Sequence, residues 1–378
     1  MDQALIPEPV FITQAKALNE AVDSLAQQAI LAIDTESNSL FAYQEQVCLI
    51  QISTPQVDYL VDPLALTDLS PLSRIFADPN IEKVFHAAEY DLICLRRDFG
   101  FQFANLFDTM LAARILGKKE FGLGVILEAE FGVFLDKRHQ RANWGQRPIP
   151  AHLVQYASQD SHYLIPLRDR LRAELVEKQL WCLALEDFNR LSQLNHELNN
   201  NGRGQCWRIA GAHVLTPQQT AVLQELCAYR DQMARTYNRP LFKVIGDQTL
   251  LAVASTCPRS IDELKGLPGV SRGQLQRHGK GLLKAVSRGL QAEPVYAPRP
   301  ARPDEGYLLR LDRLKRWRKR TAQELDVESD VILPRDLLYM IAERNPRQAQ
   351  DMADLLRDAP WRLDHFGSQI LAALHNKS

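Results

Sequence analysis

Residues 29–36 have the sequence Ala-Ile-Leu-Ala-Ile-Asp-Thr-Glu, an apolar run that ends in two acids one residue apart. A short continuous apolar run indicates a strand buried on both faces of a sheet. Because side chains alternate along a strand, Asp34 and Glu36 point to the same side. Adjacent carboxylates repel each other, and a cation between them relieves that repulsion. The stretch predicts a divalent-metal platform, although a strand that ends in two solvated acids has the same pattern.

The chain after this strand predicts a mixed α/β sheet. Residues 47–53 and 57–62 are apolar, and the turn-forming Thr-Pro-Gln at 54–56 separates them, which indicates an antiparallel meander. Predicted strands and helices then alternate, with a helix over 69–76, a strand over 81–86, a helix over 90–99, a strand over 106–108 and a helix over 109–116. That alternation is typical of a partly parallel sheet with helices packed on it.

Further acids lie on or beside the predicted helices. Asp91 falls in the first turn of a helix, where an acid either stabilises the helix dipole or brings a third carboxylate to the first strand. We expect Asp108 to be an N-terminal helix acid rather than a metal ligand. Tyr156 and Asp160 are four residues apart on a predicted helix, so they share one face and can reach one site together. Taken alone, a tyrosine in the middle of a helix is usually half-buried in packing, and an aspartate there is usually solvated.

Together these residues form three motifs in a fixed order. They are Asp34-Thr35-Glu36 on a strand, His86-x-x-x-Tyr90-Asp91 after a second strand, and Tyr156-x-x-x-Asp160 on a helix. This set resembles the DEDD 3′–5′ exonucleases, in their tyrosine-containing subgroup. The resemblance implies a ribonuclease-H-like mixed sheet, which agrees with the pattern of strands and helices, and it implies metal-dependent hydrolysis of phosphodiester bonds.

Four carboxylates without cysteine ligands suit Mg²⁺ or Mn²⁺, which prefer oxygen. The resemblance implies two such divalent ions. Asp34 would bridge them, and Asp91 would act at one of them, mainly through its waters. Glu36 and Asp160 would hold the ion that binds the attacking water. Tyr156 would orient that water and help to remove its proton, with the metals doing most of the activation because a phenol titrates near about 10.

Residues 135–148 lie between the second and third motifs and contain basic side chains, a tryptophan and an Arg-Pro pair. Basic groups meet phosphates and an aromatic ring stacks on a base, so the segment predicts a substrate rim. A solvated loop with one anchoring tryptophan fits the same residues equally well. The segment also resembles the ribonuclease D pattern, which favours RNA contact. With the histidine of the second motif, the candidate RNA contacts are His86, Lys137, Arg138, Arg141, Trp144 and Arg147.

The middle of the chain is basic. Residues 1–204 carry 18 basic and 27 acidic side chains, whereas residues 205–300 carry 13 basic and 6 acidic ones. That division is expected if one part holds metals and another holds phosphates, although a chance drift of surface charge gives the same counts. Residues 229–244 and 264–270 are similar to the helicase-and-ribonuclease-D C-terminal (HRDC) domain, a small helical bundle. The candidate RNA-binding residues here are Arg272, Arg277, Lys280 and Lys284.

The fold class that we predict is α/β, with a ribonuclease-H-like exonuclease domain followed by two small all-α helical bundles. The polar cluster at 199–204 marks the first domain boundary. The last segment repeats the helical pattern of the first HRDC module but lacks its Arg-Pro-x-Phe-Lys-Val signature, so its RNA-binding role stays open. The basic run from Arg313 to Arg320 is a candidate RNA patch, although such a run is more often a solvated helix face. The predicted segments are an exonuclease domain at 1–204, a first HRDC domain at 205–291, a proline-rich linker at 292–303 and a second, diverged HRDC-like domain at 304–378.

The sequence also predicts a cytoplasmic protein. Its first residues lack the basic and apolar segments of a signal peptide, and no apolar run is long enough to cross a bilayer. The six cysteines form no Cys-x-x-Cys pair and have no zinc-like spacing with histidines. We therefore expect them to be reduced, mostly buried thiols.

An exonuclease domain followed by two HRDC modules resembles the bacterial ribonuclease D family over nearly the whole chain. This resemblance implies a metal-dependent 3′–5′ exoribonuclease that trims tRNA precursors and releases nucleoside 5′-monophosphates. The expected partner is RNA with a free 3′ end, with no membrane and no obligate protein partner. Two alternatives are a 3′–5′ DNA exonuclease of the kind associated with RecQ-type helicases and a non-catalytic RNA-binding protein on a nuclease fold. Sugar preference and metal-dependent release of mononucleotides distinguish the three functions.

Overall fold

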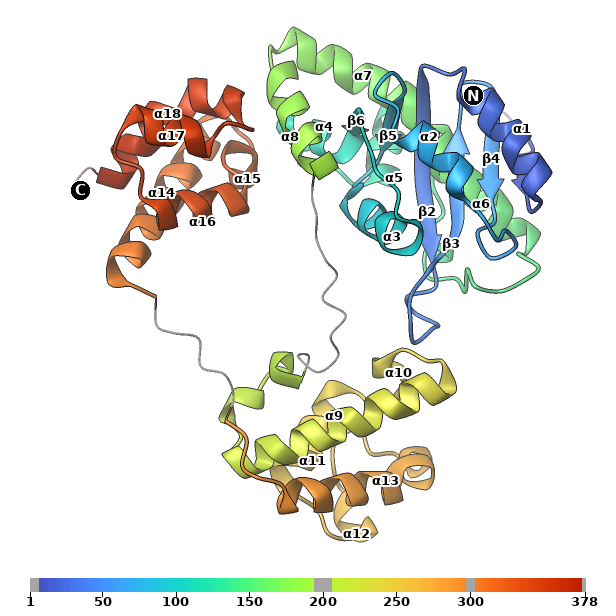
Figure 1. Cartoon of the computed structure of the whole chain (residues 1–378), viewed down its shortest axis with the longest axis vertical. Coiled ribbons are helices and arrows are strands. Elements are labelled where there is room, and N and C mark those ends of the chain that lie inside the picture. Colours follow the sequence, from blue (N-terminus) through green and yellow to red (C-terminus); the bar gives the residue numbers. More distant parts are fainter. Residues whose placement is uncertain (1–6, 194–205, 297–302, 376–378) are drawn as a thin grey trace. The chain divides into compact units, whose positions relative to one another are not determined.

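The structure, a computed structural model, describes residues 7–193, 206–296 and 303–375 (Figure 1). Contacts divide these residues into two compact units. The first unit holds the described residues up to 37, residues 47–193 and residues 303–375. The second unit holds residues 38–46 and 206–296. The predicted boundary at 199–204 and half of the predicted linker at 292–303 lie outside the described residues, so the domain boundaries stay predictions.

The first unit contains a six-stranded mixed sheet in the order β1-β4-β3-β2-β5-β6. β2 is antiparallel to β3, and β3 is antiparallel to β4, which confirms the predicted meander. The pairs β2–β5, β5–β6 and β1–β4 are parallel, which makes the sheet mixed as predicted. The strands are β1 (Val10–Ile12), β2 (Ile30–Ser37), β3 (Val47–Ser53), β4 (Asp58–Val61), β5 (Glu82–Phe85) and β6 (Leu106–Asp108).

Apolar side chains cover both faces of this sheet, as the continuous apolar run in β2 requires. On one face, Leu31 and Ile33 of β2 pack with side chains of α1, α2 and α3. On the other face, Ala32 packs with side chains of α4, α5, α7 and α8. The helices of this part are α1 (Ala15–Leu25), α2 (Ser73–Phe76), α3 (Glu89–Phe99), α4 (Thr109–Ile115), α5 (Leu123–Phe131), α6 (Ala151–His162), α7 (Leu164–Glu177) and α8 (Trp181–Gln193).

The central strand β2 extends beyond its neighbour β5. β5 pairs with β2 only from Ile30 to Ala32, whereas β3 pairs with β2 as far as Ser37. The part of β2 that carries Asp34 and Glu36 therefore lies beyond its pairing with β5. Glu36 is opposite Leu49 of β3, which packs with side chains of α6, and opposite residues in a sheet share a face. The two acids thus point to the side of the sheet that α6 covers.

Five C-terminal helices form a bundle with its own apolar core in the same unit. Arg362 joins this bundle to α8, because its buried guanidinium bonds to Glu186 and to Asp187, with nitrogen–oxygen distances of 2.8 and 3.0 Å to Asp187. An exposed ion pair between Arg190 and Asp336 also joins them. These helices are α14 (Glu305–Glu324), α15 (Ser329–Ile332), α16 (Arg335–Arg344), α17 (Ala349–Leu355) and α18 (Pro360–His375).

The second unit is a helical bundle around a separate apolar core. Its helices are α9 (Pro217–Tyr237), α10 (Leu241–Val244), α11 (Asp247–Thr256), α12 (Ile261–Leu264) and α13 (Arg272–Gln291). The order of a long helix, a four-residue helix, a ten-residue helix, a short helix and a second long helix recurs from α14 to α18. This recurrence supports the interpretation of the C-terminal segment as a diverged second copy.

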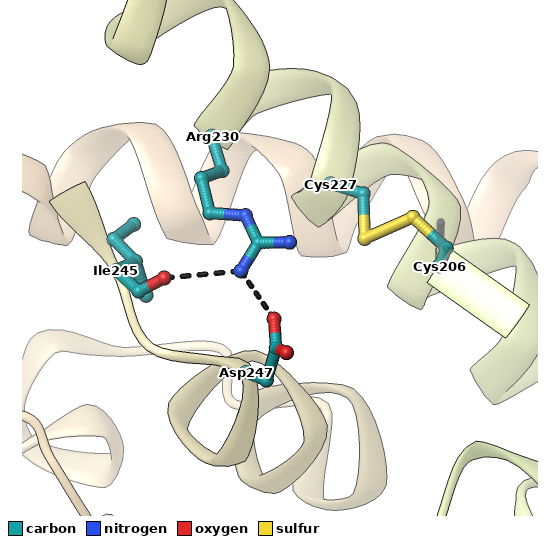
Figure 2. The surroundings of a disulfide bond; sticks show 5 residues. All are labelled: Cys206, Cys227, Arg230, Ile245 and Asp247. Atoms are coloured by element: carbon teal, nitrogen blue, oxygen red, sulfur yellow. Dashed lines mark hydrogen bonds and ion pairs between the residues drawn. A yellow bond between two sulfur atoms is a disulfide. The ribbon is translucent and has the colours of Figure 1, made fainter. Parts of the chain in front are cut away.

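Cys206 and Cys227 form a disulfide within the second unit (Figure 2). It joins a short 3-10 helix to α9, and its two Cα atoms are 6.4 Å apart. The prediction of six reduced thiols is therefore wrong for these two residues, since a pairing across 21 positions depends on the fold and leaves no local pattern. Cys48 and Cys94 are buried and lie outside this disulfide, as expected, whereas Cys182 is exposed.

None of the helices within the described residues combines the length and the apolar character needed to cross a membrane.

Candidate active site

Three carboxylates meet where β2 extends past β5. Asp34 and Glu36 come from β2 and Asp160 comes from α6, and one ligand oxygen from each lies within 4.8 Å of the others. Asp160 is 9% exposed, and the other two side chains are half-buried. The structure thus brings the first and third sequence motifs together.

Asp91 lies beside this cluster rather than in it. It is in the first turn of α3, on the opposite face of the sheet. Thr35 points to that face, since it alternates with the two acids of β2, and its hydroxyl donates a hydrogen bond to Asp91. Burial raises the pKa of Asp91, and the charge of Asp34 raises it further. The fourth acid is therefore near enough to interact with the cluster, but it approaches from the other side of β2.

Burial and mutual repulsion raise the pKa values of the clustered carboxyl groups. Burial is the larger cause for Asp34 and Glu36, and the charge of a neighbouring acid adds to it in both. Burial also raises the pKa of Asp160 to about 7, against a smaller lowering by the Tyr156 hydroxyl. A bound cation relieves this repulsion, and an all-carboxylate set is what Mg²⁺ or Mn²⁺ prefers. The residues present therefore fit a divalent metal.

Tyr156 lies one helical turn from Asp160 on the same face of α6. Burial and the charges of Asp160 and Glu36 raise the pKa of its phenol far above the usual value, so the hydroxyl keeps its proton at neutral pH. Its ring packs against Trp144 and His139, with ring centroids 6.0 and 5.5 Å apart. These contacts hold the hydroxyl at the acidic cluster as a hydrogen-bond donor.

The cluster opens into a cavity of about 420 Å³, which is within the size range of small-molecule and nucleotide sites. Residues 122–124, a Gly-Leu-Gly segment at the start of α5, form part of its wall. Leu135, Asp136 and Gln140 line it as well. Residues 122–124 were not predicted as part of the site, whereas the other three lie in the predicted rim segment but were not among its candidate RNA contacts. Two glycines at a helix start are a recognisable local signal, but the other three positions depend on how the loop folds over the cavity.

Two residues of the predicted substrate rim contact other parts of the protein. Trp144 is only 1% exposed, so its ring cannot stack on a base, and it packs beneath Tyr156. Arg147 pairs with Asp62 in a two-pronged ion pair of 2.6 and 2.7 Å and donates to the carbonyl of Cys48. The predicted base contact is therefore wrong for Trp144, whereas RNA contact by Arg147, whose side chain is 27% exposed, stays a prediction. The loop sequence does not reveal either set of partners, because these come from other segments of the chain.

The other predicted rim residues have different positions. His86 lines the cavity, and burial lowers its pKa, which favours a neutral imidazole. Arg138 is exposed and pairs with its neighbour Asp136 at 2.6 Å. Arg141 is exposed. The side chain of Lys137 lies outside what the structure describes. RNA contact by His86, Arg138 and Arg141 stays a prediction.

Asp108 caps α4, as expected of an N-terminal helix acid. One of its oxygens accepts hydrogen bonds from the amides of Met110 and Leu111. The amides of Ala87 and Ala88, between β5 and α3, also donate to its carboxylate. Asp108 therefore fixes the connection that carries Asp91 to the site.

In the second unit, the four predicted RNA-binding residues are all exposed on α13, and three of them recur at helical spacing, so they lie along one stripe. The four residues are Arg272, Arg277, Lys280 and Lys284.

Comparisons with known proteins match the two kinds of domain. Residues 9–176 match a 3′–5′ exonuclease family model, and residues 219–286 and 308–374 each match the HRDC domain. The chain is 32% identical over 279 residues to ribonuclease D of Cronobacter turicensis, an alignment that covers 73% of this chain and 75% of that protein.

Solved structures agree with the sequence comparisons. The crystal structure of Escherichia coli RNase D, described as an exoribonuclease involved in structured RNA processing, is 27% identical with a TM-score of 0.69 and covers 98% of this chain and 100% of that one. The chain is also 33% identical to protein RRP6-like 3 of Arabidopsis thaliana over 68% of its own length. It spans only about a third to a half of the length of the plant RRP6-like relatives that it matches.

Proposed function

The chain belongs to the ribonuclease D family, and from this membership we propose that it is a metal-dependent 3′–5′ exoribonuclease. It removes nucleotides one at a time from RNA 3′ ends and releases nucleoside 5′-monophosphates. The observation that carries the proposal is the gathering of Asp34, Glu36 and Asp160 beside Tyr156 in one cavity. A surface with this many repelling carboxylates is suited to holding cations that bind phosphate.

The four acids would together hold two divalent ions, Mg²⁺ or Mn²⁺. Asp34, whose charge interacts with those of the other three acids, would contact both ions, while Glu36 and Asp160 would hold one of them. Asp91, on the opposite side of β2, would hold the second through water. Bound divalent ions supply Lewis acidity for the attacking water and the leaving alkoxide. Tyr156, which keeps its proton, orients the attacking water by donating or accepting one hydrogen bond.

Metal affinity is expected to fall as the pH drops through about 7, where burial places the pKa of Asp160. The metal-binding form is the carboxylate, so the metal dissociation constant should rise about tenfold from pH 8 to pH 6 for this one group. Because the pKa of Asp160 is higher in the folded state than in the unfolded state, its protonation stabilises the fold at low pH. This stabilisation is lost as the pH rises through about 7, the pKa in the folded state. Because the carboxylate form binds Mn²⁺ more tightly, added Mn²⁺ should raise the stability of the fold more at pH 8 than at pH 6.

Calorimetric titrations with Mn²⁺ at pH 6, 7 and 8 measure this dependence, and two buffers with different ionisation enthalpies count the protons released. An affinity that stays constant across this range would contradict the role of Asp160 as a ligand.

Replacing Tyr156 with Phe should slow hydrolysis about 10- to 100-fold and change RNA affinity by less than about twofold. The substitution keeps the ring that packs on Trp144 and removes only the hydroxyl beside Asp160. Single-turnover kinetics at saturating enzyme separate the chemical step from binding. An unchanged single-turnover rate would exclude a role for the hydroxyl at the water. Replacing the neighbouring Gln155 with Ala is a suitable control, because that exposed side chain points away from α6's buried face.

The substrates that we propose are tRNA precursors and other structured RNAs with short single-stranded 3′ tails. The basic surface of α13 supports binding to the RNA body, because phosphates bind Lys and Arg without regard to sequence. A cytoplasmic location is part of the same proposal.

A 5′-labelled single-stranded RNA, the matching DNA and an RNA with a blocked 3′ end test the proposed activity. We expect a ladder that shortens from the 3′ end of the RNA with Mg²⁺, and no ladder with chelator or with the blocked end. A ladder mainly on DNA would assign the protein to the repair-type exonucleases. The absence of any ladder would leave a binding protein on a nuclease fold.

A further inference from the structure

A pocket of about 450 Å³ lies in the second unit, and none of its lining residues belongs to the acidic cluster. It is formed by the C-terminal end of α9, by α10 and by the first half of α13, and we call it the α9–α13 pocket. Its lining is mostly polar and contains no acid. The lining residues are Tyr237, Arg239, Lys243, Val244, Arg277 and His278.

The cations of this pocket lack acidic partners among the described residues, in contrast to Arg230 and Arg288 of the same unit. Neither Arg239 nor Arg277 has a carboxylate within ion-pair distance among the described residues, and both are exposed. Lys243 also lacks such a partner there, although its ammonium lies 4.1 Å from the centroid of the Phe41 ring. Three positive charges therefore converge on one hollow without an internal counter-charge.

Several cations elsewhere in the unit pair with acids. Arg230 is buried and pairs with Asp247 at 2.6 Å, which is visible beside the disulfide in Figure 2. Arg288, further along α13, pairs with Glu225 at 2.6 Å. The module thus places acids beside the cations that hold it together and leaves them out of the pocket, which is the arrangement that suits an anionic ligand.

The pocket also presents an aromatic face. Tyr237 is 48% exposed at the end of α9. Behind it, the ring of His278 is buried at 6.2 Å from the Tyr237 ring, and its Nδ1 lies 3.0 Å from the Tyr229 hydroxyl. This packing fixes the back of the pocket and leaves the outer part of the Tyr237 side chain accessible. An accessible ring beside unpaired arginines can take a stacked base and its phosphate together.

We propose that the α9–α13 pocket binds one nucleotide of single-stranded RNA, with the phosphate at Arg239 and Arg277 and the base against Tyr237. The strand is single because a base inside a duplex has no free face for the ring. This inference rests on the proposed function, since it takes RNA as the ligand, and it gives the basic module a defined subsite rather than a diffuse positive surface.

The test compares two double variants of the full chain that lose the same charge. Arg239→Gln/Arg277→Gln removes two of the pocket's three cations, the two arginines that we place at the phosphate. Arg259→Gln/Arg288→Gln removes two exposed cations of the same module outside the pocket. Binding of a fluorescent 20-nucleotide single-stranded RNA is measured by anisotropy with chelator present, so that no hydrolysis occurs, over a series of salt concentrations.

We expect the pocket variant to bind about tenfold more weakly and to lose about 1.4 from the slope of log affinity against log salt, as two phosphate contacts on a single strand would give. The control variant should change affinity by less than about threefold and keep its slope. Equal losses in both variants would overturn the pocket and leave only a diffuse electrostatic contribution.

Tyr237 variants test the stacking. Tyr237→Ala should weaken single-strand binding about tenfold, whereas Tyr237→Phe should bind like the wild type, because the ring alone supplies the stacking. Blunt double-stranded RNA should not distinguish the three proteins. Equal affinity of Tyr237→Ala and wild type for single strands would contradict the base contact.

Hydrolysis by the wild-type chain separates this inference from the proposed function. If the wild type shortens RNA but the two double variants bind alike, only the pocket assignment fails. If the wild type does not shorten RNA but the pocket variant still loses single-strand binding, the exonuclease proposal fails and the subsite stands.

Discussion

The Asp34→Asn variant is expected to lose RNA hydrolysis by on the order of a thousandfold while remaining folded. Asp34 interacts with all three of the other acids, since its charge raises the pKa values of both Glu36 and Asp91 and the charge of Asp160 raises its own. Asparagine has nearly the same shape but no charge, so it weakens metal binding without leaving a void. Rates of mononucleotide release at saturating Mg²⁺ measure the effect.

Stability distinguishes this loss from misfolding. Removing one of several repelling carboxylates should leave the melting temperature in chelator unchanged or raise it, whereas added Mn²⁺ should stabilise the variant less than the wild type. Asp136→Asn is the matched control: Asp136 also lines the cavity, but it pairs with Arg138 and is outside the acidic cluster. We expect it to retain activity within about threefold. Hydrolysis by Asp34→Asn at the wild-type rate would refute the metal-bridging role.

The Arg362→Met variant is expected to destabilise the first unit by about 3–5 kcal/mol. The Arg362 side chain is 0% exposed and its partner Glu186 is 1% exposed, so the substitution leaves a buried carboxylate without a cation. Two backbone amides, of Trp361 and residue 362 itself, also donate to Glu186 and would hold it in place. Burial alone would lower the pKa of Arg362, but the carboxylates of Asp187 and Glu186 outweigh it and raise the pKa.

A matched substitution in the same contact region gives the comparison. Arg190 also bridges α8 to the C-terminal bundle, but its partner Asp336 is 65% exposed, so Arg190→Met should cost about 1 kcal/mol or less. Urea denaturation followed by tryptophan fluorescence compares the two, and Trp361 lies beside the buried charges. Equal shifts in the urea midpoint would show that burial of the Arg362 pair has no energetic consequence.

The sheet and the first and third motifs could be predicted from the sequence because their signals are local. The apolar run ending at Asp34 requires a buried strand, and the four-residue spacing of Tyr156 and Asp160 requires a shared helix face. The sequence did not predict β1, because this strand has only three residues, two of them exposed, and so shows no alternation of apolar and polar side chains.

The remaining features depend on contacts between distant segments. Asp91 approaches β2 from the opposite face because α3 packs there, which a motif does not reveal. Trp144 and Arg147 are residue types that are typical of a substrate rim. In the structure, however, Trp144 packs against Tyr156 and Arg147 pairs with Asp62. The catalytic roles of the acids and the RNA contacts stay predictions that the experiments above address.

The route of the chain has a consequence for dissecting the protein. The chain leaves the first unit after the α8 region, builds the helical part of the second unit, and returns as α14 to α18 to complete the first. A single backbone cut within residues 206–296 would therefore leave two fragments held by the Arg362 contacts, with an association that now depends on concentration. A version shortened at residue 296 would instead uncover Glu186 without its cation. Fragment complementation, rather than truncation, is the way to study the exonuclease part apart from the module that interrupts it.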